Sequence, residues 1–246
     1  MIKRIGAICI CLGVVCILSS VGFVIYNQWE DKSAEKVSKV LLQDVQSIID
    51  KKIANDNTQQ LPQDSEEMQG NTEKLPDDNG QIPNDSLQLP EEVEKEPENT
   101  EQLPQDTETP QKEMARIKVD GYDCVGILSI PVLNLKLPVL TDWSYAKLKI
   151  APCVYYGSYY EPDFVIAAHN YKAHFRRLSE LKSGDIVLFT DANGVEYIYE
   201  VVLMETLPKD ATKEMITSGF DLSLYTCTTG RANRVTARCS LKETNK

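Results

Sequence analysis

The chain has 246 residues and a formal net charge of −11 at pH 7, and this charge is concentrated in one segment. Residues 60 to 108 hold fifteen acidic residues against two lysines, whereas the rest of the chain, with 22 acidic and 24 basic residues, is nearly neutral. Proteins that bind nucleic acid carry a basic surface, so the composition argues against nucleic acid as a partner.

The first predicted element is a membrane anchor. Residues 5 to 26 contain no charge, and at 1.5 Å rise per residue they are long enough to cross a hydrocarbon core of roughly 30 Å. Lys3 and Arg4 precede the run and Trp29 follows it, so the positive-inside rule places residues 1 to 4 in the cytoplasm as a short tip. We therefore expect a single-pass protein of the cell membrane with its remaining residues outside the cell. A cleaved signal peptide is the alternative, but its apolar run should span about 7 to 15 residues and end in small residues.

Residues 33 to 54 follow as a predicted juxtamembrane helix. Apolar side chains recur there at steps of three and four residues, which is typical of an amphipathic helix. The apolar positions are Val37, Val40, Leu41, Val45, Ile48, Ile49 and Ile53. We interpret the helix as a short stalk; pairing with a second copy or contact with lipid is the alternative.

A repeat of seven residues fills positions 60 to 108. Proline occupies the same position in six of the seven repeats, which excludes a coiled coil because proline removes helical hydrogen bonds. With few apolar residues and strong self-repulsion, the segment cannot offset its ordering entropy by burial. We expect residues 55 to 118 to form an extended acidic spacer.

The remaining residues, 119 to 246, show short β-type runs separated by turn signals. Asp191 to Gly194 has the residues of a hairpin turn between two of these runs. Short helices are predicted at residues 144 to 149, 174 to 181 and 212 to 218. The expected strands are residues 125–130, 133–140, 153–157, 164–169, 185–190, 195–204, 222–227 and 234–241. Eight short strands with few helices predict a mainly β domain that closes into an eight-stranded β-barrel.

Three side chains at strand ends could together perform acyl transfer. A thiol nucleophile needs a proton partner and a donor for the developing oxyanion. Cys227 ends one predicted strand, His169 ends another, and a hairpin could return Arg234 beside Cys227. His174, the other histidine, lies among basic residues and is expected to be solvated. From spacing alone, a buried cysteine with a structural histidine and a surface arginine remains an equal reading.

Several stretches resemble the sortase family. SLYTC (223 to 227) resembles the TLxTC signature of sortases, and AAHNY (167 to 171) resembles their histidine region. VGILSIPVLNLKLPVL is similar to the first two sortase strands, and NRV (233 to 235) to the start of the strand that carries their arginine. The resemblance covers about residues 121 to 242 and is closest to the class B and D branches.

The resemblance implies a sortase-type barrel and a cysteine transpeptidase that cuts an LPxTG-like sorting signal. Cys227 would form the thioacyl intermediate, His169 would act as acid and base, and Arg234 would stabilise the oxyanion. Thr226 and Ser223 would position the substrate, although Ser223 stands where the signature usually has Thr. Residues 205 to 221 correspond to a loop that contacts substrate in sortases. Arg231 and Arg238 are the competing arginines.

The partners implied are secreted proteins with a C-terminal sorting signal and an amine acceptor, either a peptidoglycan cross-bridge or a pilin lysine. No cofactor or metal is expected, because metal-ligand spacing of the C-x-x-C type is absent. Two alternatives are an extracellular cysteine peptidase that hydrolyses, and a non-catalytic binding barrel displayed on the surface. A disulfide between Cys153 and Cys239 is a further possibility left open by the sequence.

Overall fold

The computed structural model describes residues 2–59 and 112–245; in the first segment, side chains are described from residue 13 to 56, without residues 23 and 27. All described residues belong to one unit. The predicted cytoplasmic tip has no described side chains, and the repeats of the spacer lie outside the described residues.

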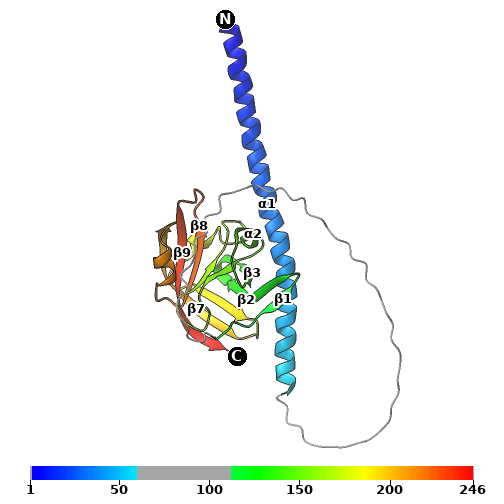
Figure 1. Cartoon of the computed structure of the whole chain (residues 1–246), viewed down its shortest axis with the longest axis vertical. Helices are drawn as coiled ribbons and strands as arrows, with labels where there is room; N and C mark the ends of the chain where they lie inside the picture. The colour runs from blue at the N-terminus through cyan, green and yellow to red at the C-terminus, as the bar shows by residue number, and fades with distance from the viewer. Residues whose placement is uncertain (1, 60–111, 246) are drawn as a thin grey trace, which may run out of the picture. The chain divides into compact units, whose positions relative to one another are not determined.

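In the described residues, nine strands form one sheet in the order β1-β2-β3-β4-β5-β8-β9-β7-β6; Figure 1 labels β1 to β3 and β7 to β9. The strands are β1 (Ile117–Val119), β2 (Tyr122–Ile130), β3 (Leu135–Leu140), β4 (Cys153–Tyr156), β5 (Phe164–Ala167), β6 (Ile186–Asp191), β7 (Glu196–Pro208), β8 (Leu222–Cys227) and β9 (Asn233–Asn245). β2 also pairs with β6, so the pairings join the eight strands β2 to β9 in a ring, with β1 added beside β2. The helices are α1 (Ile2–Gln59), α2 (Tyr145–Leu148) and α3 (Thr212–Ile216).

The mainly β class is confirmed, and every predicted strand has a counterpart. The number of strands was wrong by one, because the three residues of β1 are too few to give an alternating pattern. The helix expected over residues 174 to 181 was also wrong. Its backbone makes turns instead, with the N–H of Phe175 donating to the carbonyl of His169, and only Leu178–Glu180 forms a short 3₁₀ helix.

The hairpin between β6 and β7 forms at the predicted turn. Asp191 Oδ1 accepts hydrogen bonds from the N–H groups of Asn193, at 2.8 Å, and Val195, at 2.9 Å. Gly194 has φ +88°, a conformation that side chains disfavour, which explains glycine at this position.

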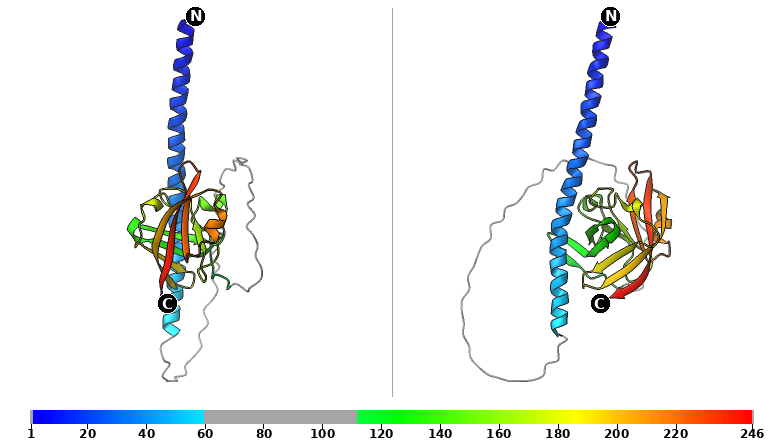
Figure 2. Two further views of the ribbon diagram at one scale, coloured as in Figure 1. Left: turned by 90° about the vertical axis from the view of Figure 1, so that its left-hand side faces the viewer. Right: turned by 180° about the vertical axis from the view of Figure 1, so that it is seen from behind.

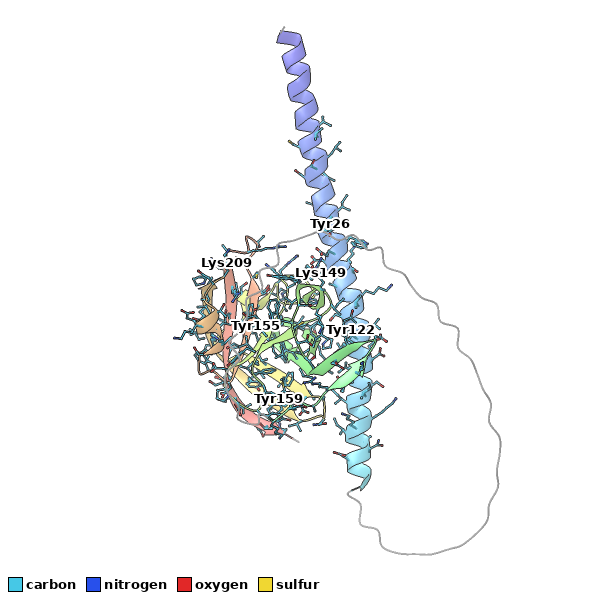
Figure 3. All side chains as sticks on the ribbon, viewed as in Figure 1. Tyr26, Tyr122, Lys149, Tyr155, Tyr159 and Lys209 are labelled. Carbon is cyan, nitrogen blue, oxygen red and sulfur yellow. The ribbon has the colours of Figure 1, made fainter. Side chains whose placement is uncertain are left out.

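Alternation along the strands places one set of side chains in a common core. Tyr159, which Figure 3 labels, lies in this core with Phe164 and Phe189. On β8 the core residues are Leu222 and Leu224. The residues between them point to the opposite face of the sheet, where the candidate site lies.

The segment expected to be a stalk packs against the domain. Residues 33 to 54 are helical, as predicted, within the longer α1 (Figure 2). One face of α1 is buried, and the helix contacts β1, β2 and β3. The buried residues on this face are Ala34, Ser38, Leu41, Val45 and Ile49. Leu41, Val45 and Ile49 of the predicted apolar stripe are thus covered, whereas Val37, Val40 and Ile53 stay exposed.

Within the described part of the chain, no helix is both long and apolar enough to cross a membrane. The anchor expected over residues 5 to 26 is therefore not confirmed.

Burial of the α1 face predicts a difference between two valines on that helix. Val45 is fully buried, whereas Val40 is 46% exposed. We expect Val45→Ala to lower the free energy of unfolding by about 2 kcal/mol, from lost transfer energy and a residual cavity, and Val40→Ala to change it by less than about 0.5 kcal/mol. Urea unfolding followed by circular dichroism measures both. Equal effects of the two substitutions would show that α1 does not stabilise the domain.

Candidate active site

Strand register brings the three predicted site residues to one end of the sheet. β5 and β8 are parallel neighbours that pair Ala167 with Tyr225. Two residues further along each strand, the chain reaches His169 and Cys227. β8 and β9 are antiparallel and pair Cys227 directly with Arg234. Cys227 ends β8, Arg234 lies near the start of β9, and His169 follows two residues after β5, so the three come from neighbouring parts of the sheet; β8 and β9 are labelled in Figure 1.

The same register assigns the residues to one face. Cys227 and Tyr225 alternate with the core residue Leu224, so their side chains point away from the core. On β9, Arg234 alternates in the same way with the core residue Ala237, three positions on. We call this side the outward face, and it carries the residue pairs Ser223 with Arg238, Tyr225 with Thr236 and Cys227 with Arg234.

His169 follows directly on a segment that is held to β8. The N–H of Ala168 donates to the carbonyl of Tyr225 at 3.1 Å, and Thr226 Oγ1 donates to the carbonyl of Ala168 at 2.8 Å. Burial lowers the pKa of His169, and the carboxylate of Glu30 opposes this shift. The imidazole is therefore neutral near pH 7, the form that can accept a proton from a thiol.

Arg234 is held by aromatic rings. Its guanidinium carbon lies 5.2 Å from the ring centroid of Tyr225 and 5.9 Å from that of Tyr155, and the two rings meet edge to face at 5.2 Å. Figure 3 labels Tyr155 among the strands. The Nη1 atom of Arg234 is buried and has no hydrogen-bond partner among the described residues. A buried donor without a partner is rare, and this one is available to an anionic oxygen.

The two competing arginines have other surroundings. Arg231 lies in the turn between β8 and β9, where its N–H donates to the carbonyl of Thr228. Arg238 is only 2% exposed, and its guanidinium donates to Glu205 and Ser223. Of the three arginines, Arg234 is the one paired across from Cys227.

The two predicted substrate-positioning residues have partners within the chain. Thr226 points toward the core side of β8 and holds Ala168, the neighbour of His169. Ser223 lies on the outward face but is fully buried, and its hydroxyl accepts a hydrogen bond from Arg238 Nη1 at 2.7 Å. Direct contact of either residue with substrate remains a prediction.

Cys227 differs from the other thiols of the domain in its burial. Cys124, Cys153 and Cys239 are buried, and burial raises the pKa of each to about 12. Such thiols are inert near neutral pH. Cys227 is half-buried. All four are free, so the possible disulfide between Cys153 and Cys239 does not form.

Two features of the site were missed in the sequence. Tyr225 stands two residues before Cys227, so the period of a strand could have placed it on the same face as the thiol. His174 was expected to be solvated but is 1% exposed, with its ring centroid 5.5 Å from that of Tyr171. The basic neighbours of His174 gave no sign of this, because its burial comes from tertiary packing.

A family model described as "Sortase domain" matches residues 128–242. Sortase D of Bacillus subtilis (strain 168) is 32% identical over 104 residues, which cover 41% of this chain and 52% of that protein. The chain thus spans about half the length of the curated relative it matches.

Solved structures are similar to about half of the chain. Sortase A of Listeria monocytogenes is 21% identical, with a TM-score of 0.47, over 50% of this chain and 90% of that one. Sortase C of Clostridium perfringens SM101 is 24% identical, with a TM-score of 0.44, over 49% of this chain and 71% of that one. A structure of Clostridium perfringens sortase C with the C-terminal cell wall sorting motif gives 24% identity and a TM-score of 0.45, over 49% and 71%.

The bond from Thr226 to Ala168 predicts an effect on thiol reactivity. Thr226→Val keeps the shape but removes the donor, which should lower the free energy of unfolding by about 1 kcal/mol. Because His169 follows Ala168, we also expect alkylation of Cys227 to slow several-fold. Thr217→Val is the matched control, since Thr217 Oγ1 makes a comparable bond at an exposed site. Alkylation of the Thr226→Val variant at the wild-type rate would contradict the positioning of His169 through this bond.

Burial of His174 predicts a pH-dependent stability. Burial, with a smaller contribution from nearby His169, lowers its pKa from 6.5 to about 4. Between these values the unfolded chain binds more protons, so the stabilisation is complete above pH 6.5 and is lost as the pH falls to about 4. The loss should be about 3 kcal/mol. Urea unfolding at several pH values should give a shallower slope for His174→Gln than for the wild type; parallel slopes would refute the assignment.

Proposed function

We propose that the chain is a member of the sortase family, whose domain model matches residues 128–242, and that it is a cysteine transpeptidase with Cys227 as its nucleophile. His169 is the proposed acid and base, and Arg234 the proposed oxyanion partner. The observation that carries the proposal is the strand register, which sets Cys227 opposite Arg234 and at the same strand end as His169.

In the first half of the reaction, the Cys227 sulfur attacks the scissile carbonyl of a sorting signal. His169 takes the thiol proton and passes it to the departing amine as the C–N bond breaks, leaving a thioester on Cys227. The negative charge on the carbonyl oxygen develops beside Arg234, whose buried Nη1 has a hydrogen-bond donor to offer.

In the second half, an incoming amine attacks the thioester. His169 removes its proton and the Cys227 sulfur departs, so that a new amide bond replaces the thioester. Water competes with the amine for the same carbon, and excluding it favours transfer over hydrolysis. The rings of Tyr155 and Tyr225 support this, because they place apolar surface beside the guanidinium of Arg234.

For the substrates, we propose secreted proteins with an LPxTG-like C-terminal sorting signal, and as acceptor an amine of a cell wall cross-bridge or a pilin lysine. Family membership supports this substrate class and a place at the cell surface. Cleavage of a peptide library would identify the residues that follow the Leu-Pro pair of the signal.

A peptide ligation assay tests the proposal. The purified chain is mixed with a library of LPxTG-like peptides, with and without an amine acceptor, and the products are read by mass spectrometry. We expect acceptor-dependent ligation that is abolished in Cys227→Ala and lowered in Arg234→Ala by about 10² or more in kcat. A thioester adduct of Cys227 should be trapped when the acceptor is left out.

Two matched variants serve as controls for that assay. Cys16→Ala removes an exposed thiol of α1, and Arg177→Ala removes an exposed arginine paired with Glu180; both should keep wild-type activity. Hydrolysis alone at high acceptor concentration would identify a peptidase instead. No turnover together with equal, slow alkylation of all domain thiols would identify a binding module.

A further inference from the structure

Arg238 on β9 has an unusual set of contacts for an arginine outside the proposed catalytic group. It is among the largest fully buried side chains of the described residues. All three guanidinium nitrogens are used: Nε donates to Glu205 Oε1 at 2.6 Å, and Nη1 donates to Ser223 Oγ at 2.7 Å. Its partners thus lie on β7 and β8, the strands on either side of β9.

The other bonds of Arg238 reach the connection between β7 and β8. Nη1 donates to the carbonyl of Met215 at 3.2 Å, and Nη2 donates to the carbonyl of Glu214 at 2.8 Å. Both carbonyls belong to α3, and the ring of Phe220, later in the same connection, lies 5.9 Å from the guanidinium carbon. One side chain therefore ties α3 to two strands of the sheet.

Arg238 also lies on the face that carries the catalytic group. Ser223 and Arg238 form a cross-strand pair on the outward face, four residues along the strands from Cys227 and Arg234. At about 3.3 Å per residue the two pairs are roughly 13 Å apart. An extended peptide that runs from the thiol toward α3 would bring a residue about four positions from its cut to that helix.

Only arginine can make this set of bonds. The planar guanidinium offers five donors in fixed directions, whereas a lysine would keep the charge and lose the fork. Glu205 supplies the opposite charge that a buried cation needs. The geometry is therefore a rigid clamp on α3 rather than a free cation offered to substrate.

We propose that Arg238, held by Glu205 and Ser223, is a positioning residue that fixes α3 on the outward face and so controls the affinity for the peptide substrate. Arg238 acts through α3 and does not touch the reacting atoms. The inference rests on the proposed function, and on residues 205 to 221 as the segment that contacts substrate.

Two substitutions loosen the clamp while leaving the catalytic group intact. Glu205→Gln removes the charge partner of Arg238, and Ser223→Ala removes one of its acceptors. We expect both to raise KM for the sorting peptide by about 5- to 20-fold, with kcat and the alkylation rate of Cys227 within about twofold of wild type. Ser223→Thr keeps the hydroxyl, so the KM of this variant should equal that of the wild type.

Glu200→Gln is the matched control. Glu200 lies on the same strand, pairs with Lys242 of β9 and has the same exposed side-chain fraction as Glu205, 30%. Its KM should equal that of the wild type. If Glu205→Gln does not fold, Arg238→Lys, which keeps the charge but loses the fork of donors, takes its place. A lower melting temperature with an unchanged KM in the clamp variants would show that Arg238 has only a structural role. Equal losses in kcat and in the alkylation rate of Cys227 would assign Arg238 to the catalytic group instead.

Failure of the inference and failure of the proposed function give different results. If wild type and Glu200→Gln ligate peptide but the clamp variants keep their KM, the inference alone is wrong. If wild type gives no product, the proposed function fails. Peptide binding to a Cys227→Ala chain, measured by fluorescence anisotropy with and without Arg238→Lys, then tests the clamp without turnover. Equal affinities overturn it, and a 5- to 20-fold weaker affinity supports it.

Discussion

The pairing register of β8 with β5 and β9 is the constraint on which the proposed chemistry depends. It sets Cys227 opposite Arg234 and level with His169. Since side chains alternate across a strand, a slip of one residue would turn Leu222 and Leu224 out of the core and Cys227 toward it. Exposing two buried leucines costs several kcal/mol. The hydrophobic core therefore fixes the geometry of the reactive face on its other side.

Two arginines on one face of β9 differ because of what surrounds them. Arg238 uses its nitrogens on Glu205, Ser223 and α3, so its charge and its donors are satisfied within the protein. Arg234 rests on aromatic rings, which favour a cation but accept no conventional hydrogen bond. It thus keeps a donor for a charge that arises only during reaction. One strand therefore supplies both the proposed clamp and the proposed oxyanion partner.

Burial suppresses charge on the other titratable groups near the site. It holds the thiols of Cys124, Cys153 and Cys239 in their protonated, unreactive form, and it keeps His169 and His174 neutral. Among the domain thiols, Cys227 alone is half-exposed and lies beside a histidine and an arginine. Burial thus keeps the other three thiols unreactive, which leaves Cys227 as the proposed nucleophile.

The sequence by itself determined the β class, eight of the nine strands and the identity of Cys227, His169 and Arg234 as candidates, since alternation and motifs are local patterns. Only the tertiary structure decided which arginine stands opposite the thiol, that Ser223 gives its hydroxyl to Arg238, that His174 is buried and that α1 packs on the sheet. These four depend on which distant segments become neighbours, and strand pairing and packing, unlike periodicity, leave no local trace in the order of residues.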